Sequence, residues 1–232
     1  MDLEEGVVIP IDKPYGWTSA DVVRKVKFLL QKKTGQKKIK VGHAGTLDPL
    51  ATGLLLLCVG KATKLADSLQ AEEKEYVADI RLGATTPSFD LEKEIDAVYP
   101  FEHITKEAVE HVLQQFTGVQ EQIPPVFSAK LIDGKRAYEL ARAGKTTEMK
   151  PAVVTIKELA LLQYALPDII IRITCSKGTY IRSLARDLGA ALQSGGHLTG
   201  LRRTRSGQHK VEAAFNLENV ENMIKNMEFP KK

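Results

Sequence analysis

Residues 42–53 read GHAGTLDPLATG, and the apolar run LLLLCV follows at residues 54–59. The loop contains one carboxylate, Asp48, together with three glycines and Pro49, which fixes the backbone directly after the acid. The apolar run predicts a buried strand, so the loop would present Asp48 at the end of that strand, as suits a nucleophile or general base. The same residues also form ordinary Asp-Pro turns before core strands, and turn chemistry alone favours that second interpretation.

Helix and strand patterns alternate around this loop. Thr18 or Ser19 can cap a helix whose apolar residues share one face and which ends at Gly35. The other expected strands lie at 6–11, 53–59, 76–82, 126–132, 153–165 and 169–175, and the other expected helices at 62–69, 105–116, 138–143, 179–192 and 217–227. This irregular order, without a glycine-rich nucleotide-binding fingerprint, favours a mixed α+β fold over a Rossmann fold.

The composition is that of an ordinary globular chain. Of 232 residues, 43% are hydrophobic and 27% are charged, and the net charge of +4 is too small to indicate a nucleic-acid partner by itself. Basic residues nevertheless form two clusters, which suit either phosphate neutralisation or a solvated surface: Lys32, Lys33, Lys37, Lys38 and Lys40, and Arg202, Arg203, Arg205 and Lys210.

The cysteines and the N-terminus bear on the cellular compartment. Cys58 and Cys175 lack the spacing of a zinc site or a disulfide framework, so we expect buried thiols in a reducing compartment. The acidic N-terminal residues lack the pattern of a signal peptide, and no apolar run reaches the roughly 20 residues that span a bilayer. We therefore expect a cytoplasmic protein with no membrane association.

Six segments match, in order, the sequence pattern of one enzyme family. They are IDKPYGWTS at 11–19, GHAGTLDPLATGLL at 42–55, KEYVADIRLGATTPSFD at 74–90, IPPVFSAKLIDGKRAYELARAG at 123–144, CSKGTYIRSLARDLG at 175–189 and HLTGLRRTRSG at 197–207. Together they resemble the TruB-type tRNA pseudouridine synthases over about residues 7–207. Six motifs in register are far more specific than any one of them.

The resemblance implies a fold and a domain plan. The fold would be the pseudouridine synthase fold, a mixed and mainly antiparallel central sheet flanked by helices, with a thumb-like insertion at about 123–144 that clamps the substrate. The catalytic domain would cover residues 1–207, and residues 208–232 would form a short tail with one helix. Since about 25 residues are too few for the RNA-binding PUA domain common in the family, we expect a member without a full PUA domain.

The resemblance also implies an activity, the isomerisation of the T-loop uridine of tRNA, at position 55, to pseudouridine. The bond between C1′ of the ribose and N1 of uracil breaks, the base turns, and C1′ is joined to C5. No electrons are exchanged and no group is donated, so we expect no cofactor and no metal. Asp48 matches the catalytic aspartate of the family, which either attacks covalently or removes the 2′ proton; both routes remain open.

Arg182 matches the family arginine that pairs with the catalytic aspartate. A carboxylate in a dry pocket would otherwise take up a proton, and a planar guanidinium suits bidentate contact with it. Helix geometry places Arg182 beside the buried stripe of the 179–192 helix, so a solvated flank is the alternative. Tyr180 is expected to contact the sugar or to hold the aspartate, and half-buried core is its alternative.

Four further positions match residues that bind the substrate or support the loop. Tyr76 matches the aromatic platform for the extruded base, where stacking offsets part of the roughly few kcal/mol that extrusion costs. His43 matches the residue that fills the space left by the flipped base, and Leu201 matches a residue that lines the uracil pocket. Lys13, followed by Pro14, is expected to brace the loop. The alternatives to these binding roles are a core position for Tyr76, a turn position for His43 and a core position for Leu201.

The expected partner is the T-arm of tRNA, bound by a monomer that needs no protein partner. Three other functions stay open. The chain could be an RNA-folding module that clamps tRNA without catalysis, or a guide-RNA-dependent synthase that works within a protein complex. A hydrolytic nucleosidase, which would release free uracil, is more distant. The segment KRAYELARAG at 135–144 is similar to the stand-alone synthases and favours them.

Overall fold

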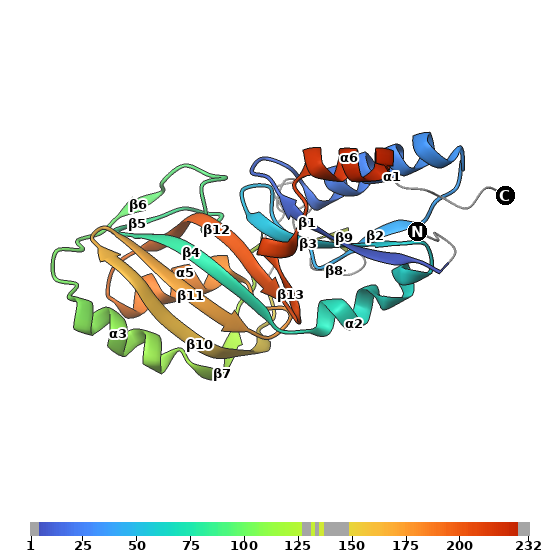
Figure 1. Ribbon diagram of the computed structural model, residues 1–232. Coiled ribbons are helices and arrows are strands. Elements are labelled where there is room, and N and C mark those ends of the chain that lie inside the picture. The colour runs from blue at the N-terminus through green and yellow to red at the C-terminus, as the bar shows by residue number, and fades with distance from the viewer. Residues whose placement is uncertain (1–4, 127–130, 133–134, 137–148, 227–232) are drawn as a thin grey trace. The chain divides into compact units, whose positions relative to one another are not determined.

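The computed structural model describes residues 5–126, 131–132, 135–136 and 149–226 (Figure 1). The chain divides into two compact units, one formed by residues 1–76 and 201–232 and the other by residues 77–200. Strands β4 (Lys74–Leu82) and β12 (Gly196–Ser206) each contribute residues to both units. The first unit is therefore built from both ends of the chain. The expected plan of a catalytic domain over 1–207 with a short tail stays a prediction.

Strand β3 (Thr52–Val59) is the centre of the first unit. It pairs antiparallel with β1 (Val7–Lys13) and β2 (Val41–Ala44) and parallel with β12. Every β3 residue after Thr52 is buried, because one face packs on a core cluster that includes Ala62 and Val211 and the other face is also covered. A strand covered on both faces reads as a continuous apolar run, which explains the sequence LLLLCV.

Helices α1 (Ser19–Thr34) and α6 (Leu217–Asn226) pack side by side in this unit (Figure 1). The ends of α1 follow from its sequence. The side chain of Thr18 accepts a hydrogen bond from the backbone N–H of Asp21, and the Asp21 carboxylate accepts one from the N–H of Thr18. Gly35 ends the helix in the left-handed conformation, with φ of 71°. The predicted helix and both of its caps are confirmed.

The remaining elements of the first unit are short. They are the 3₁₀ helices η1 (Gly60–Leu65) and η2 (Val211–Ala213), helix α2 (Ala66–Ala71) and strand β13 (His209–Lys210), which pairs antiparallel with β12. The prediction of an α-helix over 62–69 is thus wrong for its first half, which is a 3₁₀ helix. Gly60 begins a 3₁₀ turn in which Thr63 donates its hydroxyl hydrogen to the Gly60 carbonyl, and α-helical geometry starts only at Ala66.

In the second unit the strand order is β12–β4–β11–β10–β7. The long strand β10 (Ala152–Ala165) pairs antiparallel with both β11 (Asp168–Cys175) and β7 (Gly118–Gln122). Helix α3 (Lys106–Gln115) contacts β10 and helix α5 (Ile181–Ala191). The described residues of this unit also form two small antiparallel pairs, β5 (Ala84–Thr85) with β6 (Ala97–Val98) and β8 (Leu131–Ile132) with β9 (Lys135–Arg136).

The expected α+β fold with a mainly antiparallel sheet is confirmed, with β3 and β12 as a parallel pair. Strands β2, β7 and β12 were not expected, since glycines, glutamines and arginines interrupt their apolar pattern. The helix predicted over 138–143 and most of the strand predicted over 126–132 lie outside the described residues. Both cysteines are buried thiols, as expected. Among the described helices, none combines the length and the apolar character that crossing a bilayer requires.

Candidate active site

The Asp48 loop connects β2 to β3 in the first unit. Asp48 is half-buried, and its carbonyl accepts a hydrogen bond of 3.1 Å from the N–H of Ala51, which closes a turn. Gly45 and Gly53, near the two ends of the loop, have φ of 95° and 97°, values that other residues rarely adopt. A Cβ on Gly53 would also lie 2.3 Å from the carbonyl oxygen of Arg203. The shape of the loop therefore requires glycine at both of these positions.

A buried arginine that was not predicted as a site residue holds both ends of this loop. Arg203 of β12 is 2% exposed; its Nε donates to the Leu54 carbonyl at 2.7 Å, and its Nη2 donates to the Gly45 carbonyl at 3.0 Å. The two roles predicted for the basic clusters, phosphate neutralisation and a solvated surface, are therefore both wrong for Arg203. Its neighbours are also paired, Arg202 with Asp12 and Arg205 with Glu73, each at 2.7 Å. Much of the C-terminal basic cluster therefore has intramolecular partners.

Lys13 links the turn that follows β1 to the Asp48 loop. Its side chain is fully buried, and its Nζ donates to the carbonyls of Pro14 at 3.0 Å, Trp17 at 2.6 Å and Pro49 at 3.3 Å. Burial lowers the pKa of Lys13 to about 8, attraction to Asp48 opposes that shift, and repulsion from Arg203 adds to it. The ammonium is thus close enough to Asp48 to attract it electrostatically.

This unusual pKa gives a pH prediction. Below about pH 8 the folded chain carries the full penalty of a buried ammonium, and between about 8 and the ordinary value of 10.5 the folded chain loses that proton before the unfolded chain does. The unfolding free energy of the wild type, minus that of Lys13→Met, should therefore rise over this interval. Urea denaturation of both proteins at pH 7 to 10 measures it. A constant difference would show that Lys13 titrates normally.

His43 lies on β2, just before the loop. Its pKa is lowered from the ordinary value, first by burial and then by repulsion from Arg203, so the imidazole is mainly neutral at pH 7. Its Nδ1 atom is buried and has no hydrogen-bond partner within the described part of the chain. A neutral ring offers no cation for a phosphate.

Tyr76 and Leu201 also belong to the first unit. Tyr76 of β4 is 9% exposed and follows Lys74, whose ammonium donates to the carbonyls of Leu69, Gln70 and Glu72 at the end of α2. Lys74 thus anchors the start of the strand that carries Tyr76. Leu201 is half-buried, and its carbonyl accepts a hydrogen bond of 3.4 Å from Thr52. The expected contacts of Tyr76 and Leu201 with a uracil stay predictions.

In the second unit, Arg182 occupies the first turn of α5 and is 4% exposed, so the alternative of a solvated flank is wrong. Its Nη1 lies 3.7 Å from Oδ2 of Asp90, whose side chain is also buried. Asp90 is held in turn, since its carbonyl accepts a hydrogen bond from Thr86 at 2.7 Å and its Oδ1 accepts one from the N–H of Glu92 at 3.0 Å. Asp90 was not predicted as a site residue, although it is the last residue of the family-like segment at 74–90.

A second missed residue, Gln122 at the end of β7, holds the backbone of Tyr180. Its Oε1 accepts a hydrogen bond of 2.8 Å from the Tyr180 N–H, and its Nε2 donates one of 3.1 Å to the Tyr180 carbonyl. Nearby, the hydroxyl of Ser183 donates to the Ile123 carbonyl at 2.8 Å. The start of α5, which carries Tyr180 and Arg182, is therefore fixed to β7. No apolar pattern marked Gln122 in the sequence, because its neighbours on the same strand face are Gly118 and Gln120.

The predicted residues fall in both units. The structure brings Lys13 and His43 together with the Asp48 loop, whereas the expected pairing of Arg182 with Asp48 joins one residue of each unit and stays a prediction. The first unit contains Lys13, His43, Asp48, Tyr76 and Leu201, and the second contains Tyr180 and Arg182.

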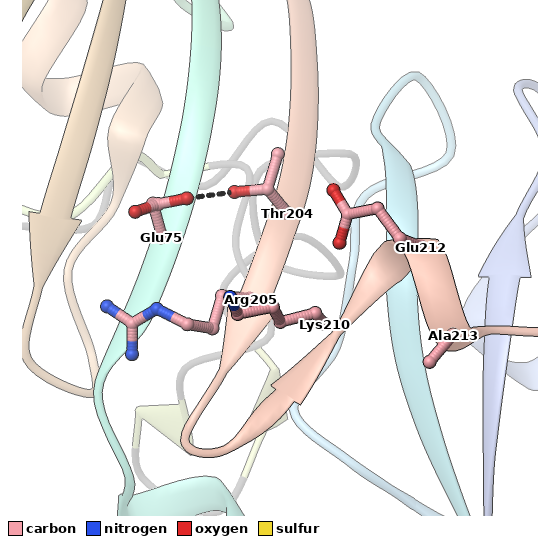
Figure 2. Close-up of a pocket in the computed structure, with 6 residues that line it drawn as sticks. All are labelled: Glu75, Thr204, Arg205, Lys210, Glu212 and Ala213. Atoms are coloured by element: carbon pink, nitrogen blue, oxygen red, sulfur yellow. Dashed lines mark hydrogen bonds between the residues drawn. The ribbon is translucent and has the colours of Figure 1, made fainter.

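A hollow of about 520 Å³ lies in the first unit, beside β12 and β13. Figure 2 draws the residues that line it. Two of its four charged lining residues have intramolecular partners, because Thr204 donates to Glu75 at 2.7 Å and Arg205 pairs with Glu73. None of the predicted site residues lines it, so the hollow is not the candidate active site. The lining residues are Glu75, Thr204, Arg205, Lys210, Glu212 and Ala213.

Comparison with known proteins identifies the family of the chain. Residues 31–181 match the model of the TruB family pseudouridylate synthase N-terminal domain, and residues 182–230 match that of the tRNA pseudouridylate synthase B C-terminal domain. These matches define a pseudouridylate synthase. The chain is 60% identical to tRNA pseudouridine synthase B of Phocaeicola vulgatus, over 94% of this chain and 93% of the relative, and 56% identical to that of Parabacteroides distasonis, over 97% and 95%. The chain belongs to the TruB family.

Solved structures share the fold. A chain from the crystal structure of a Cbf5–Nop10–Gar1 complex matches with a TM-score of 0.72 and 29% identity, over 95% of this chain and 54% of that chain. A chain from an H/ACA RNP bound to a substrate RNA containing 2′-deoxyuridine matches with a TM-score of 0.69 and 28% identity, over 95% and 53%. Our chain therefore spans about half the length of these solved chains.

Proposed function

We propose that this chain isomerises uridine 55 in the T-loop of tRNA to pseudouridine. The proposal is supported by relatives named tRNA pseudouridine synthase B that are 60% and 56% identical over nearly the whole length of both chains. The observation that carries it is the Asp48 loop, whose two ends are bound by one buried arginine and whose Pro49 carbonyl accepts a hydrogen bond from the Lys13 ammonium. A carboxylate so fixed is suited to act on a sugar.

The chemistry assigned to Asp48 follows from its charge. Attraction between Asp48 and the Lys13 ammonium favours the ionised form of each. An ionised carboxylate can attack C1′ of the ribose or remove the 2′ proton. In either route the N1–C1′ bond breaks, the C5–C1′ bond forms, the proton on C5 leaves, and N1 gains a proton. The reaction is balanced without an oxidant or a donated group.

Arg182, Tyr180 and Tyr76 complete the proposed site. Arg182 carries a permanent charge that would oppose protonation of Asp48 in a dry pocket, and its buried neighbour Asp90 orients it. Tyr180 would contact the sugar from a backbone fixed by Gln122. Tyr76 would stack on the uracil once the base has left the RNA loop.

The role of Tyr76 gives a second prediction. If stacking dominates, Tyr76→Phe should keep kcat/KM within about threefold, because the ring remains, whereas Tyr76→Leu should lose roughly 5- to 150-fold, the equivalent of about 1–3 kcal/mol. Single-turnover assays on a tRNA transcript would measure both variants. A severe defect in the phenylalanine variant would show that the hydroxyl takes part in the reaction.

We also propose that the chain works as a cytoplasmic monomer on bare tRNA. The solved chains taken from multi-component assemblies are only 28–29% identical to it, whereas the relatives named as tRNA pseudouridine synthases are about twice as similar. Incubation of the purified protein with an unmodified tRNA transcript, followed by mapping of carbodiimide-resistant adducts, tests the proposed function and its independence from other proteins. Without an adduct at the T-loop uridine the proposed function fails, and a requirement for a second protein would overturn the stand-alone proposal.

A further inference from the structure

Two aromatic side chains are exposed on the turn that precedes α1. Tyr15 is 59% exposed and Trp17 is 37% exposed. Single exposed aromatic side chains are common on protein surfaces, whereas two of them within three residues point to a binding surface. Between them, Gly16 has φ of 79°, and a Cβ there would meet nothing within 4 Å. The space next to Gly16, the central residue of the turn, is thus unoccupied by other parts of the described chain.

This turn is fixed to the Asp48 loop. The N–H of Gly16 donates to the Pro49 carbonyl at 2.9 Å, and the Lys13 ammonium bridges the carbonyls of Trp17 and Pro49. A few residues further on, the hydroxyl of Ser19 accepts a hydrogen bond of 2.9 Å from the N–H of Leu47. Tyr15 and Trp17 therefore project from a segment whose backbone moves with the loop that carries Asp48.

We propose that Tyr15 and Trp17 form a stacking surface for a nucleotide of the substrate RNA other than the target uridine. The inference rests on the proposed function, since RNA that presents a base to Asp48 must pass beside the attached turn. Unpaired bases in RNA loops are recognised mainly by stacking on aromatic rings, and every base has such a face. A fixed backbone lowers the entropy that the two rings lose when RNA binds.

Trp17 is the only tryptophan in the chain, which provides a direct test. Titration of the full chain with unmodified tRNA transcript should change the Trp17 fluorescence, and the change should saturate at the RNA concentration that saturates filter binding. Tyr15→Leu and Trp17→Leu should each weaken binding about 5- to 100-fold, the range for loss of one base–aromatic stack. Trp17→Phe keeps a ring and should bind within about threefold of the wild type.

Phe28→Leu is the matched control, because Phe28 is 61% exposed on α1 of the same unit and is absent from the turn. It should bind RNA like the wild type, and thermal melts of all variants check that each is folded. Saturated filter binding with unchanged Trp17 fluorescence would overturn the inference. So would leucine variants of Tyr15 and Trp17 that bind as tightly as Phe28→Leu.

The inference and the proposed function fail in different ways. If wild-type protein binds tRNA with the expected fluorescence change but forms no pseudouridine, the stacking surface stands and the proposed function fails. If pseudouridine forms at the same kcat/KM in the wild type, Tyr15→Leu and Trp17→Leu, the proposed function stands and the stacking surface is refuted.

Discussion

Replacement of Asp48 by asparagine is expected to reduce pseudouridine formation by roughly 10³-fold or more, because an amide can neither attack C1′ nor accept the 2′ proton. The side chain keeps its size, and the loop is held by backbone contacts from Arg203 and Lys13, so the fold should be unchanged. Single-turnover release of tritium from C5 of labelled uridine in a tRNA transcript would measure the loss.

Binding provides the control for this substitution. Filter retention of tRNA by Asp48→Asn should stay within about threefold of the wild type, since the proposed RNA contacts are made by other residues. Lost turnover with retained binding would support the enzyme over an RNA-folding module, although one protein can do both. A variant with near-normal turnover would show that Asp48 is not catalytic and that another group acts on the sugar.

Arg182→Lys is expected to lower kcat by about 100-fold with little change in KM, because a lysine ammonium cannot reproduce the planar fork of the guanidinium, and small misplacements in an active site have effects of this size. The buried charge next to Asp90 is preserved, so the fold should survive the change. Steady-state kinetics on a tRNA transcript would separate the two parameters.

Arg186→Lys is the matched control for Arg182→Lys. Arg186 lies one turn further along α5, pairs with Asp187 at 2.7 Å, and places its guanidinium 4.8 Å from the Phe89 ring centre. Its side chain is one quarter exposed, whereas that of Arg182 is 5% exposed. A loss in kcat of equal size in both variants would assign the effect to the packing of α5. Normal kcat in Arg182→Lys would refute the proposed role.

Local sequence patterns predicted the parts of the fold whose burial is uniform. The apolar run before Val59 marked β3, the alternation after Tyr76 marked β4, and the cap residues around α1 marked both of its ends. Strand β12 was not predicted, because it buries the long side chain of Arg203, and an arginine in a hydrophobicity pattern indicates an exposed position. A residue whose charge is satisfied by distant carbonyls cannot be distinguished from a solvated one by local pattern alone.

The same limit applies to the site. Resemblance to the family identified Asp48, Arg182 and the other predicted residues, and family membership is now confirmed. Asp90 and Gln122, which hold Arg182 and Tyr180, were missed, because their contacts join segments 92 and 58 residues apart in the chain. Such contacts depend on strand order, and the sequence pattern predicted strands but not their order.

One consequence follows from the position of Arg203 beneath the Asp48 loop. A single guanidinium binds the carbonyls of Gly45 and Leu54, which stand on either side of the carboxylate. The loop therefore loses its conformational entropy once, when the chain folds, and does not lose it again each time a substrate binds. Pre-organisation of this kind favours rapid turnover of a common substrate over adaptation to varied ones.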